Sequence, residues 1–347
     1  MSEDPNALDE AALGPYLEAH VEGFHGLEKV VKFNAGQSNP TYMLTARSGR
    51  YVLRAKPPGQ LLRSAHQVDR EYRVMKALAA TAVPVPRMLH LSPEGEASPI
   101  GRMFYVMGFV DGRVLWDPAL SEAGSNAERT AIYDAMNQTL AALHDVDVAA
   151  VGLADFGRPG SYFERQYARW LSQYRASETD RVADMEELIV WLERNMPPDD
   201  GASGLVHGDY RLDNMMFARD RPEVVAVLDW ELSTLGHPLA DLSYQCMQWY
   251  LPHDSGFKGL GGVDRKALGI PTEAEYVDAY CRRRGIGPID NWTFYLAFSF
   301  FRLAGICQGV YKRALDGNAS NPEKARTYGG AVRLLAGQAM EKIRENG

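Results

Sequence analysis

The sequence predicts an α+β protein in two domains, a smaller one built on an antiparallel sheet plus a helix and a larger one that is mainly helical. The chain has 347 residues, which is more than the ~250–300 residues that a single hydrophobic core usually serves. Strand-like runs separated by turns fill residues 30–56, and helical apolar spacing dominates the later chain. A turn at Asp111-Gly112 gives domains at residues 1–111 and 112–347.

Composition is that of a globular protein and excludes several classes of function. The hydrophobic content is 46%, and the net charge of −8 argues against a nucleic-acid or anionic-membrane binder. Three widely spaced cysteines and an N-terminus without a secretory signal indicate a cytoplasmic protein. The most apolar stretch, residues 292–307, contains Arg302 and is shorter than the ~20 residues of a membrane span, so we expect a buried helix.

The smaller domain is expected to follow the order strand, loop, strand, turn, strand, helix, strand. Gly, Ser and Asn at positions 36–39 mark the first loop, and Pro84 and Pro86 end the helix because proline cannot continue it. The expected elements are a helix within residues 5–22, strands within 30–45 and 51–56, a helix over 64–78 capped by Ser64, and a strand within 99–110.

The larger domain is expected to consist mostly of helices. Residues 251–271 are rich in Gly and Pro and lack periodicity, so they read as a flexible flap near a substrate. The expected helices lie within residues 122–145, twice within 160–196, and within 272–284, 291–315 and 322–347.

Two polar clusters interrupt apolar runs in the larger domain. Asp209 is followed five residues later by Asn214, which is the D-x-x-x-x-N spacing of a kinase catalytic loop. Asp229-Trp-Glu231 follows an apolar strand, as the metal-binding D-F-G does. In phosphoryl transfer one carboxylate orients the attacking hydroxyl, while an amide and a second carboxylate bind Mg²⁺. We therefore expect Asp209 to be catalytic, and Asn214 and Asp229 to bind the metal.

The stretch His207-Gly-Asp209 to Asn214 resembles the H-G-D-x-x-x-x-N loop of the aminoglycoside phosphotransferase (APH)-like kinases. Within that family it is most similar to the branch with a kinase-like domain fused to some acyl-CoA dehydrogenases. The resemblance covers roughly residues 25–315 and implies a two-lobed protein-kinase-like fold with ATP and Mg²⁺ as cofactors. A buried polar network without chemistry would not need this order, spacing and strand context together.

The resemblance also implies which residues hold the phosphates. Gly36, Ser38 and Asn39 would cover them, with backbone amides and the Ser38 hydroxyl as donors. Alternation along residues 51–56 puts Arg54 and Lys56 on one face. Arg54 is our candidate for the phosphate-binding cation, because its planar fork binds oxygens bidentately, and Lys56 is the alternative if the register differs.

Two further sites follow from the same resemblance. Glu71 would pair with the strand cation, the alternative being a solvated glutamate that pairs with neighbouring cations of its own helix. Met107, Phe109 and Val110 would form the hinge that binds the adenine edge, an assignment that rests on the resemblance alone.

Residues around the loop are expected to bind the substrate or to brace the loop. Tyr210, Arg211 and Glu231 would face the substrate, although Arg211 could equally form a salt bridge within the loop. His207 has no second His or Cys nearby and is expected to brace the loop, and Asp241 is expected to accept backbone hydrogen bonds from it.

The predicted function is ATP- and Mg²⁺-dependent phosphorylation of a hydroxyl group on a small molecule, either a hydroxyacyl compound or its CoA ester. The alternatives are a nucleotide-binding pseudokinase module and an aminoglycoside or choline-type kinase. We expect a monomer or homodimer that binds neither nucleic acid nor a membrane.

Overall fold

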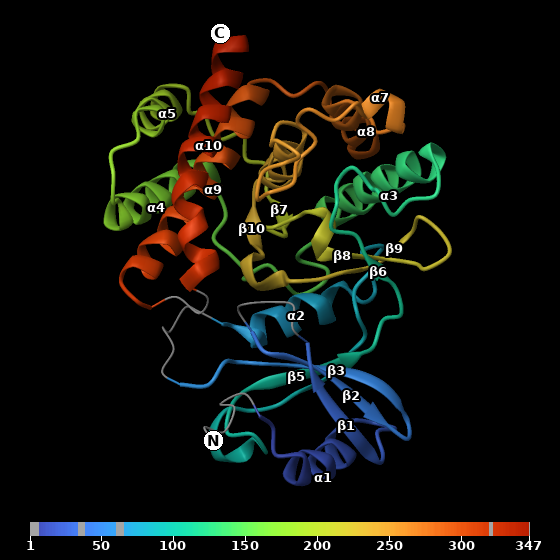
Figure 1. Ribbon diagram of the computed structural model, residues 1–347. Helices are drawn as coiled ribbons and strands as arrows, with labels where there is room; N and C mark the ends of the chain where they lie inside the picture. Colours follow the sequence, from blue (N-terminus) through green and yellow to red (C-terminus); the bar gives the residue numbers. More distant parts are fainter. Residues whose placement is uncertain (1–6, 34–38, 60–65, 319–321, 347) are drawn as a thin grey trace. The chain divides into compact units, whose positions relative to one another are not determined.

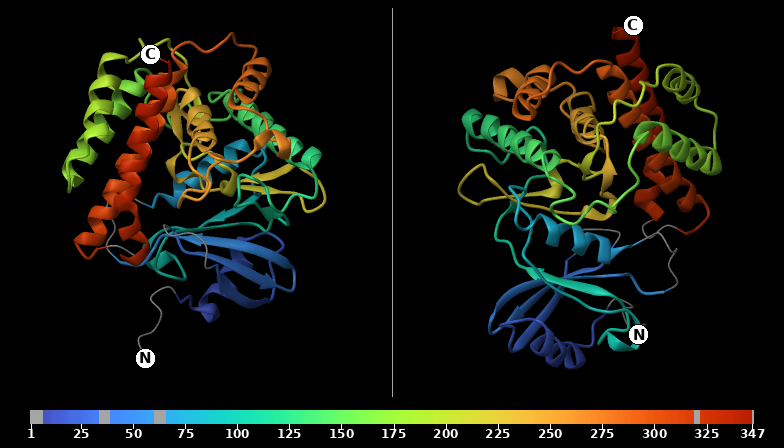
Figure 2. Two further views of the ribbon diagram at one scale, coloured as in Figure 1. Left: turned by 45° about the horizontal axis from the view of Figure 1, so that its top comes forward. Right: turned by 180° about the vertical axis from the view of Figure 1, so that it is seen from behind.

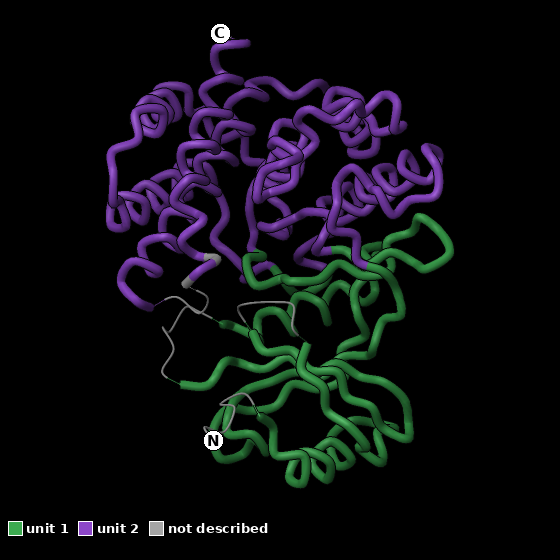
Figure 3. Tube along the Cα trace, viewed as in Figure 1, with its two compact units in different colours: residues 1–113, 151–153, 215–233 green, residues 114–150, 154–214, 234–347 purple. Residues whose placement is uncertain are grey.

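The computed structural model describes residues 7–33, 39–59, 66–318 and 322–346, and the chain divides into two compact units (Figure 3). Unit 1 is made up of Met1–Arg113, Val151–Leu153 and Met215–Ser233. Unit 2 is made up of Val114–Ala150, Ala154–Asn214 and Thr234–Gly347. The first segment of unit 1 ends close to the predicted boundary at residue 111, whereas 215–233 was expected in the larger domain.

The segment 215–233 belongs to unit 1 because its backbone and side chains bond to residues far upstream. The Val227 N–H donates to the Pro84 carbonyl (2.8 Å), and Arg54 pairs with Asp229. The segment forms a hairpin of β8 (Met215–Phe217) and β9 (Val224–Val227), followed by a 3₁₀ turn, η3 (Trp230–Leu232).

The core of unit 1 is an antiparallel sheet in the order β1-β2-β3-β5-β4. Its strands are β1 (Leu27–Lys32), β2 (Thr41–Ala46), β3 (Gly49–Ala55), β4 (Met88–Leu91) and β5 (Phe104–Gly108). Sequence analysis did not predict β4, whose four residues are only partly buried and follow the prolines that end the helix. In the central strand, Arg54 lies opposite Thr41 on β2 and Tyr105 on β5.

The two faces of this sheet carry different helices (Figure 1). Helix α1 (Glu10–His20), which Asp9 caps, buries Leu13 and Leu17 against Leu53. Helix α2 (Val68–Leu78) covers the face of Arg54 and contacts β4 and β5. Alternate residues of a strand point to opposite faces, so Leu53 joins the apolar core while Arg54 points toward α2. Ser64, the expected helix cap, lies outside the described residues. Two short elements, η1 (Gly95–Ala97) and β6 (Arg113–Val114), complete the first part of the chain.

Unit 2 is mainly helical, as predicted. Its longest helices, α9 and α10, lie side by side in every view (Figures 1 and 2). The helices are α3 (Asn126–His144), α4 (Tyr162–Ser177), α5 (Ala183–Arg194), α6 (Leu239–Cys246), α7 (Arg265–Leu268), α8 (Glu273–Arg284), α9 (Trp292–Leu315) and α10 (Pro322–Asn346), and the 3₁₀ turns are η2 (Leu212–Asn214) and η4 (Met247–Trp249).

Helix α9 is the apolar helix that the sequence predicted to be buried. It has 24 residues, within the expected range of 291–315, and by length and composition it could cross a membrane. However, 72% of its most apolar window is buried inside the protein, where Phe294, Phe298, Phe300 and Phe301 pack. A mostly buried helix of this kind is the core helix of a globular unit.

A two-stranded antiparallel ladder in unit 2 leads into the polar loop. Strand β7 (Gly204–Val206) pairs with β10 (Thr234–Gly236), and β7 ends directly before His207. Gly236 is needed at this point because an added Cβ would lie 2.5 Å from the ring of Tyr162. The ladder therefore places the start of the loop against packed aromatic side chains.

Candidate active site

The loop after β7 brings Asp209 and Asn214 together. The Asn214 Nδ2 donates to the Asp209 carboxylate (Oδ2, 2.9 Å) and to the Asp209 carbonyl (2.9 Å). Gly208 has φ +83°, a conformation that glycine adopts without strain, and the turn η2 returns the chain to Asn214. With its nitrogen turned to Asp209, Asn214 offers its amide oxygen as the atom that could bind a metal.

Asp241 braces this loop, as the sequence analysis predicted. Its carboxylate accepts the N–H groups of His207 (2.6 Å) and Gly208 (2.8 Å), and His144 Nε2 lies 3.4 Å away. Burial acts to raise the pKa of Asp241, but the hydrogen bonds and charge from His144 and His207 outweigh it and lower the pKa. Asp241 is thus a permanently charged anchor at neutral pH.

His207 also has the predicted bracing role. Its side chain is fully buried, and its Nδ1 accepts the N–H of Asp209 (3.2 Å). A ring nitrogen that accepts this hydrogen bond carries no proton, so the contact fixes the tautomer of His207 as well as the backbone of Asp209.

The Asp209 carboxylate is held by Arg211 and by two side chains that the sequence analysis missed, Tyr244 and Arg302. Burial acts to raise its pKa, but the charge of Arg211 and a hydrogen bond from Tyr244 outweigh burial and lower the pKa. Arg302 stacks over the Tyr244 ring (5.1 Å) and donates to the Gly208 carbonyl. The available signal was Arg302 itself, since a lone cation within an apolar helix requires a buried partner.

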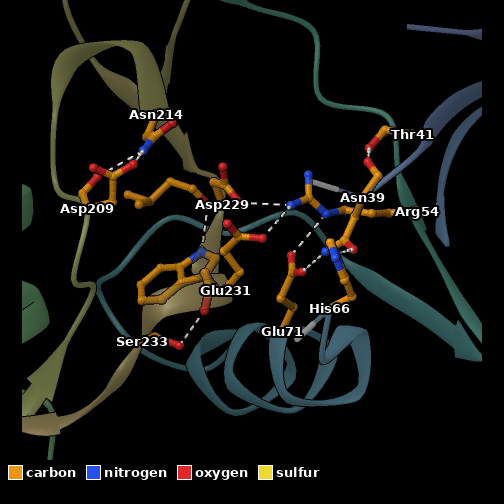
Figure 4. A network of polar contacts seen from close by, with 12 residues as sticks. Asn39, Thr41, Arg54, His66, Glu71, Asp209, Asn214, Asp229, Glu231 and Ser233 are labelled. Carbon is orange, nitrogen blue, oxygen red and sulfur yellow. Dashed lines mark hydrogen bonds and ion pairs between the residues drawn. The ribbon is translucent and has the colours of Figure 1, made fainter. Parts of the chain in front are cut away.

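A second polar cluster lies in unit 1 and is centred on Arg54 (Figure 4). Its guanidinium pairs with Glu71 (Nε to Oε2, 3.1 Å) and with Asp229 (Nη2 to Oδ1, 2.8 Å), and Glu231 lies 3.9 Å away. Burial acts to lower the pKa of Arg54, but these carboxylates raise it, so the cation stays charged. The predicted pair of strand cation and helix glutamate is therefore formed by Arg54 and Glu71.

Glu71 is almost fully buried, with 1% of its surface exposed. Its carboxylate accepts hydrogen bonds from Asn39 Nδ2 (2.9 Å) and the Tyr105 hydroxyl (3.2 Å), and Asn39 also bonds to His66 (2.9 Å). Burial raises the pKa of Glu71 to about 7, although Arg54 opposes this shift. The Asn39 side chain therefore supports Glu71, and the solvated alternative for Glu71 is wrong.

Asp229 occupies a left-handed backbone conformation (φ +63°) directly before η3. Non-glycine residues adopt this region at a cost, and such strain concentrates at functional sites. Its side chain is 36% exposed, so one face of the carboxylate reaches solvent while Oδ1 binds Arg54. Glu231, expected to face the substrate, lies beside the same arginine.

Other predicted residues have more varied positions. Lys56 pairs with Glu94 (2.9 Å), so Arg54 and not Lys56 belongs to the cluster. The expectation that Tyr210 faces the substrate is wrong, because its side chain is fully buried and its hydroxyl donates to the Met136 carbonyl (2.8 Å). Gly36 and Ser38 lie outside the described residues, and their phosphate-binding role stays a prediction.

Arg211 forms the salt bridges that the sequence left open as an alternative. It lies 3.4 Å from Asp209 and 3.2 Å from Asp213, and its side chain is 48% exposed. The guanidinium is thus held at the loop while part of it remains accessible to a ligand.

The predicted hinge follows the end of β5. Met107 is buried in the sheet, and the Phe109 N–H points to the Arg50 carbonyl (3.4 Å) while Arg50 stacks over the Phe109 ring (4.1 Å). Val110 follows outside the strand. The adenine-binding role of these three residues stays a prediction.

Residues 29–297 match the model of a single protein family, described as the phosphotransferase enzyme family. The chain belongs to this family. Among curated proteins, acyl-CoA dehydrogenase family member 10 of Mus musculus is 48% identical over 318 residues, which cover 91% of this chain and 29% of that protein. The chain thus spans less than a third of that relative's length, and the branch expected from the sequence is confirmed.

Solved structures agree on the kinase-like fold of the chain. A candidate aminoglycoside phosphotransferase from Ralstonia eutropha is 49% identical, covers 98% of this chain with 99% of its own, and superposes with a TM-score of 0.88. A spectinomycin phosphotransferase solved with ADP and spectinomycin is 13% identical, with a TM-score of 0.63 over 96% of this chain and 98% of its own. At that identity the second likeness shows the fold alone.

Unit 2 contains a cavity of about 110 Å³ beside the loop that carries Asp209. Its walls include Leu212 and Phe257 as well as the charged side chains of Arg211 and Lys258. Tyr244, the hydrogen-bond partner of Asp209, also lines it. A water molecule takes up about 30 Å³ in the liquid, so the cavity has room for about four water-sized groups, which suits a short chain of heavy atoms.

Residues 251–271 contribute to the cavity wall and are held by internal hydrogen bonds, whereas the sequence analysis expected a flexible flap. This segment folds into a closed loop, with the Gly261 N–H donating to Leu251 (2.9 Å) and the Leu260 N–H to Gln248 (2.6 Å). A Cβ on Gly259 would lie 1.9 Å from the Leu251 carbonyl oxygen, so only glycine fits there. Helix α7 lies within the segment, where no regular structure was expected.

Each unit has a side chain of the type that binds magnesium. Asp229 in unit 1 offers a carboxylate and Asn214 in unit 2 an amide oxygen, both hard ligands of the type that Mg²⁺ prefers. Among the described residues there is no cluster of three or more His, Cys, Asp or Glu that could hold a metal.

Proposed function

We propose that this chain transfers the terminal phosphate of ATP to the hydroxyl group of a small hydroxyacyl compound, as the free acid or its CoA ester, with Mg²⁺ bound. The observation that carries the proposal is the braced pair of Asp209 and Asn214, 2.9 Å apart, beside a small cavity. Catalysis of phosphoryl transfer is chiefly positioning and electrostatics, so a rigidly held carboxylate is the essential part.

Each residue would have a separate task in this reaction. Arg54, held by Glu71, would neutralise the nucleotide phosphates, and Asp229 and Asn214 would bind the metal ion. Asp209 would orient the substrate hydroxyl, and its lowered pKa keeps it ionised at neutral pH. The bound Mg²⁺ would supply charge neutralisation on the phosphate oxygens. The reaction requires Asp209 and Asn214 to act on the phosphate that unit 1 binds.

The nature of the acyl substrate is supported by one relative and by the cavity. The mouse relative carries an acyl-CoA dehydrogenase name, and its remaining length would place dehydrogenase and kinase activities in one chain. Arg211 and Lys258 line the cavity together with one carboxylate, Asp213, so cations outnumber anions on its walls, which favours an anionic ligand over a polycationic aminoglycoside or a choline-type amine.

A pseudokinase module is the competing proposal, and it lacks a specific supporting observation. Asp209, Asn214 and Asp229 are all present, and Asn214 is already hydrogen-bonded to Asp209.

The three cysteines are free and buried, which fits the proposed cytoplasmic location.

ADP release would test the proposed function in the full chain with MgATP. The substrate panel would contain hydroxybutyryl-CoA isomers and the free hydroxy acids, with kanamycin and choline in separate arms. We expect a hydroxyacyl compound to stimulate ADP release, and we expect EDTA to abolish it. Asp209→Ala should lower turnover by about 100-fold or more, while MgATP still raises the melting temperature.

Asp220→Asn is the control, because this carboxylate is an exposed residue of the β8–β9 turn. It should keep wild-type turnover. Nucleotide-induced stabilisation without stimulation by any compound would favour the pseudokinase module, and stimulation by kanamycin or choline alone would overturn the acyl substrate.

A further inference from the structure

The cavity beside the catalytic loop contains a buried amide with unused hydrogen-bonding groups. Gln245 lies on α6, next to Tyr244, and only 1% of its surface is exposed. Within the part of the chain that the structure describes, neither its Nε2 nor its Oε1 has a hydrogen-bond partner. Gln245 is one of the residues that line the cavity.

A buried primary amide without partners is unfavourable in a folded protein. Both the N–H groups and the oxygen lose their hydration, and the large majority of buried polar side chains recover it through hydrogen bonds. A buried amide that makes no hydrogen bond within the protein needs a physical reason, and a role in ligand binding is one such reason.

Another glutamine of unit 2 shows what the same side chain does when its role is structural. Gln308 on α9 is 4% exposed, and its Nε2 donates to the Ser177 carbonyl (2.6 Å) and the Thr179 hydroxyl (3.1 Å). Gln308 therefore links α9 to the end of α4. The two glutamines are equally buried, but one is satisfied by the protein and the other is not.

We propose that Gln245 is a specificity-determining residue that binds the substrate in this cavity. Its Nε2 donates to the acyl carbonyl oxygen, and its Oε1 accepts a hydrogen bond from a hydroxyl or amide N–H of the same molecule. This inference rests on the proposed function, because it assigns one feature of that substrate: a hydrogen-bonding group close to the carbon that carries the reacting hydroxyl.

The position of Gln245 limits which part of the substrate it meets. Tyr244 precedes it on α6 and bonds to Asp209, so a ligand that touches Gln245 lies near the carboxylate that orients the hydroxyl. Leu212 and Phe257 offer apolar walls for a short alkyl chain. Arg211 and Lys258 stand on the same walls and attract an anionic end. Together these groups fit a short acyl chain with a polar carbonyl.

The test compares Gln245→Met, at the unpaired amide, with Gln308→Met, the same substitution at a paired amide. Methionine has a similar length and volume but has no amide. Without ligand, Gln308→Met should lower the melting temperature, because it removes two hydrogen bonds. Gln245→Met should leave the melting temperature unchanged or raise it, because it removes only unpaired polar atoms.

Kinetics give the second readout. For the hydroxybutyryl-CoA isomer that the wild type phosphorylates fastest, Gln245→Met should raise KM by roughly 3- to 10-fold, the usual effect of one neutral hydrogen bond. The KM for ATP should not change. Gln308→Met should leave both KM values at the wild-type level.

The outcomes separate the two proposals. If Gln245→Met lowers the melting temperature as much as Gln308→Met does, the amide is paired within the protein and our inference is wrong. It is also wrong if the wild type turns over the hydroxyacyl-CoA and Gln245→Met does so with unchanged KM. A wild type that turns over no panel member would overturn the proposed function, while the melting comparison would still decide whether the amide is unpaired.

Discussion

Glu71 in unit 1 and Asp241 in unit 2 are both buried carboxylates, but their pKa values are shifted in opposite directions. Glu71 is 1% exposed and burial raises its pKa to about 7. Asp241 is completely buried, and although burial acts to raise its pKa, the value is lowered. Burial alone therefore does not decide whether a carboxylate is charged.

The difference lies in the donors that each carboxylate receives. Asp241 accepts two backbone N–H groups, at 2.6 and 2.8 Å, which the fold of the loop holds in place. Glu71 depends on Arg54, and Arg54 also pairs with Asp229 and lies near Glu231. His144, His207 and the backbone donors together favour the ionised form of Asp241, whereas a shared guanidinium divides its effect among several partners.

The comparison distinguishes a fixed anion from an adjustable one. Asp241 holds the geometry of the catalytic loop, a task that requires a constant charge. Glu71 holds a cation that the proposed reaction would present to nucleotide phosphates, so its ion pair must tolerate competition. Four substitutions test these roles and those of the neighbouring cations, in order from the largest expected effect to the smallest.

Replacing Asp241 with asparagine should produce the largest change. The substitution removes the charge and turns an NH₂ group toward backbone donors, which leaves a buried N–H without an acceptor. We expect the free energy of unfolding to fall by about 3–5 kcal/mol, with a parallel loss of turnover. Urea denaturation would measure the change, and Asp134→Asn is the control because that carboxylate is 57% exposed. A loss below about 1 kcal/mol would show that Asp241 is not the anchor.

Replacing Glu71 with glutamine should change the pH dependence of stability. The fold raises the pKa of Glu71 from 4.5 to about 7, so its neutral form is favoured. The stabilisation from binding this proton is complete below about pH 4.5 and is lost as the pH rises through about 7. Over that range the wild type should lose up to about 3 kcal/mol relative to Glu71→Gln.

Parallel urea titrations of both proteins between pH 4.5 and 8 would check this slope. Groups other than Glu71 titrate in both proteins, so the difference between the two curves isolates the carboxyl group. A difference that does not vary with pH would show that Glu71 is ionised throughout, like Asp241.

The smallest effects should distinguish Arg54 from Lys56. Arg54→Lys keeps the charge that Glu71 requires but loses the bidentate fork, so the affinity for MgATP should fall roughly 10-fold. Lys56→Ala removes a half-exposed pair with Glu94 and should change the affinity less than about 2-fold. Titration calorimetry would measure both. A larger loss for Lys56→Ala would reverse the assignment of the phosphate-binding cation.

Much of the fold and part of the site were predictable from the sequence because they depend on short-range patterns. Asp209 and Asn214 are five residues apart, so a single turn brings them together. Strand alternation correctly put Arg54 and Leu53 on different faces of the sheet. Helical periodicity located α3, α8 and α9. Weak or interrupted patterns failed, as at β4, which is short and only partly buried.

The sequence by itself determined which side chains could perform phosphoryl transfer and the order in which the chain presents them. The tertiary structure decided how those side chains are held: Tyr210 turns inward to Met136, Asn39 supports Glu71, and Arg302 reaches Gly208. These contacts join residues 74, 32 and 94 positions apart. Local spacing carries no information at such separations, because only the packing of whole elements sets which distant residues meet.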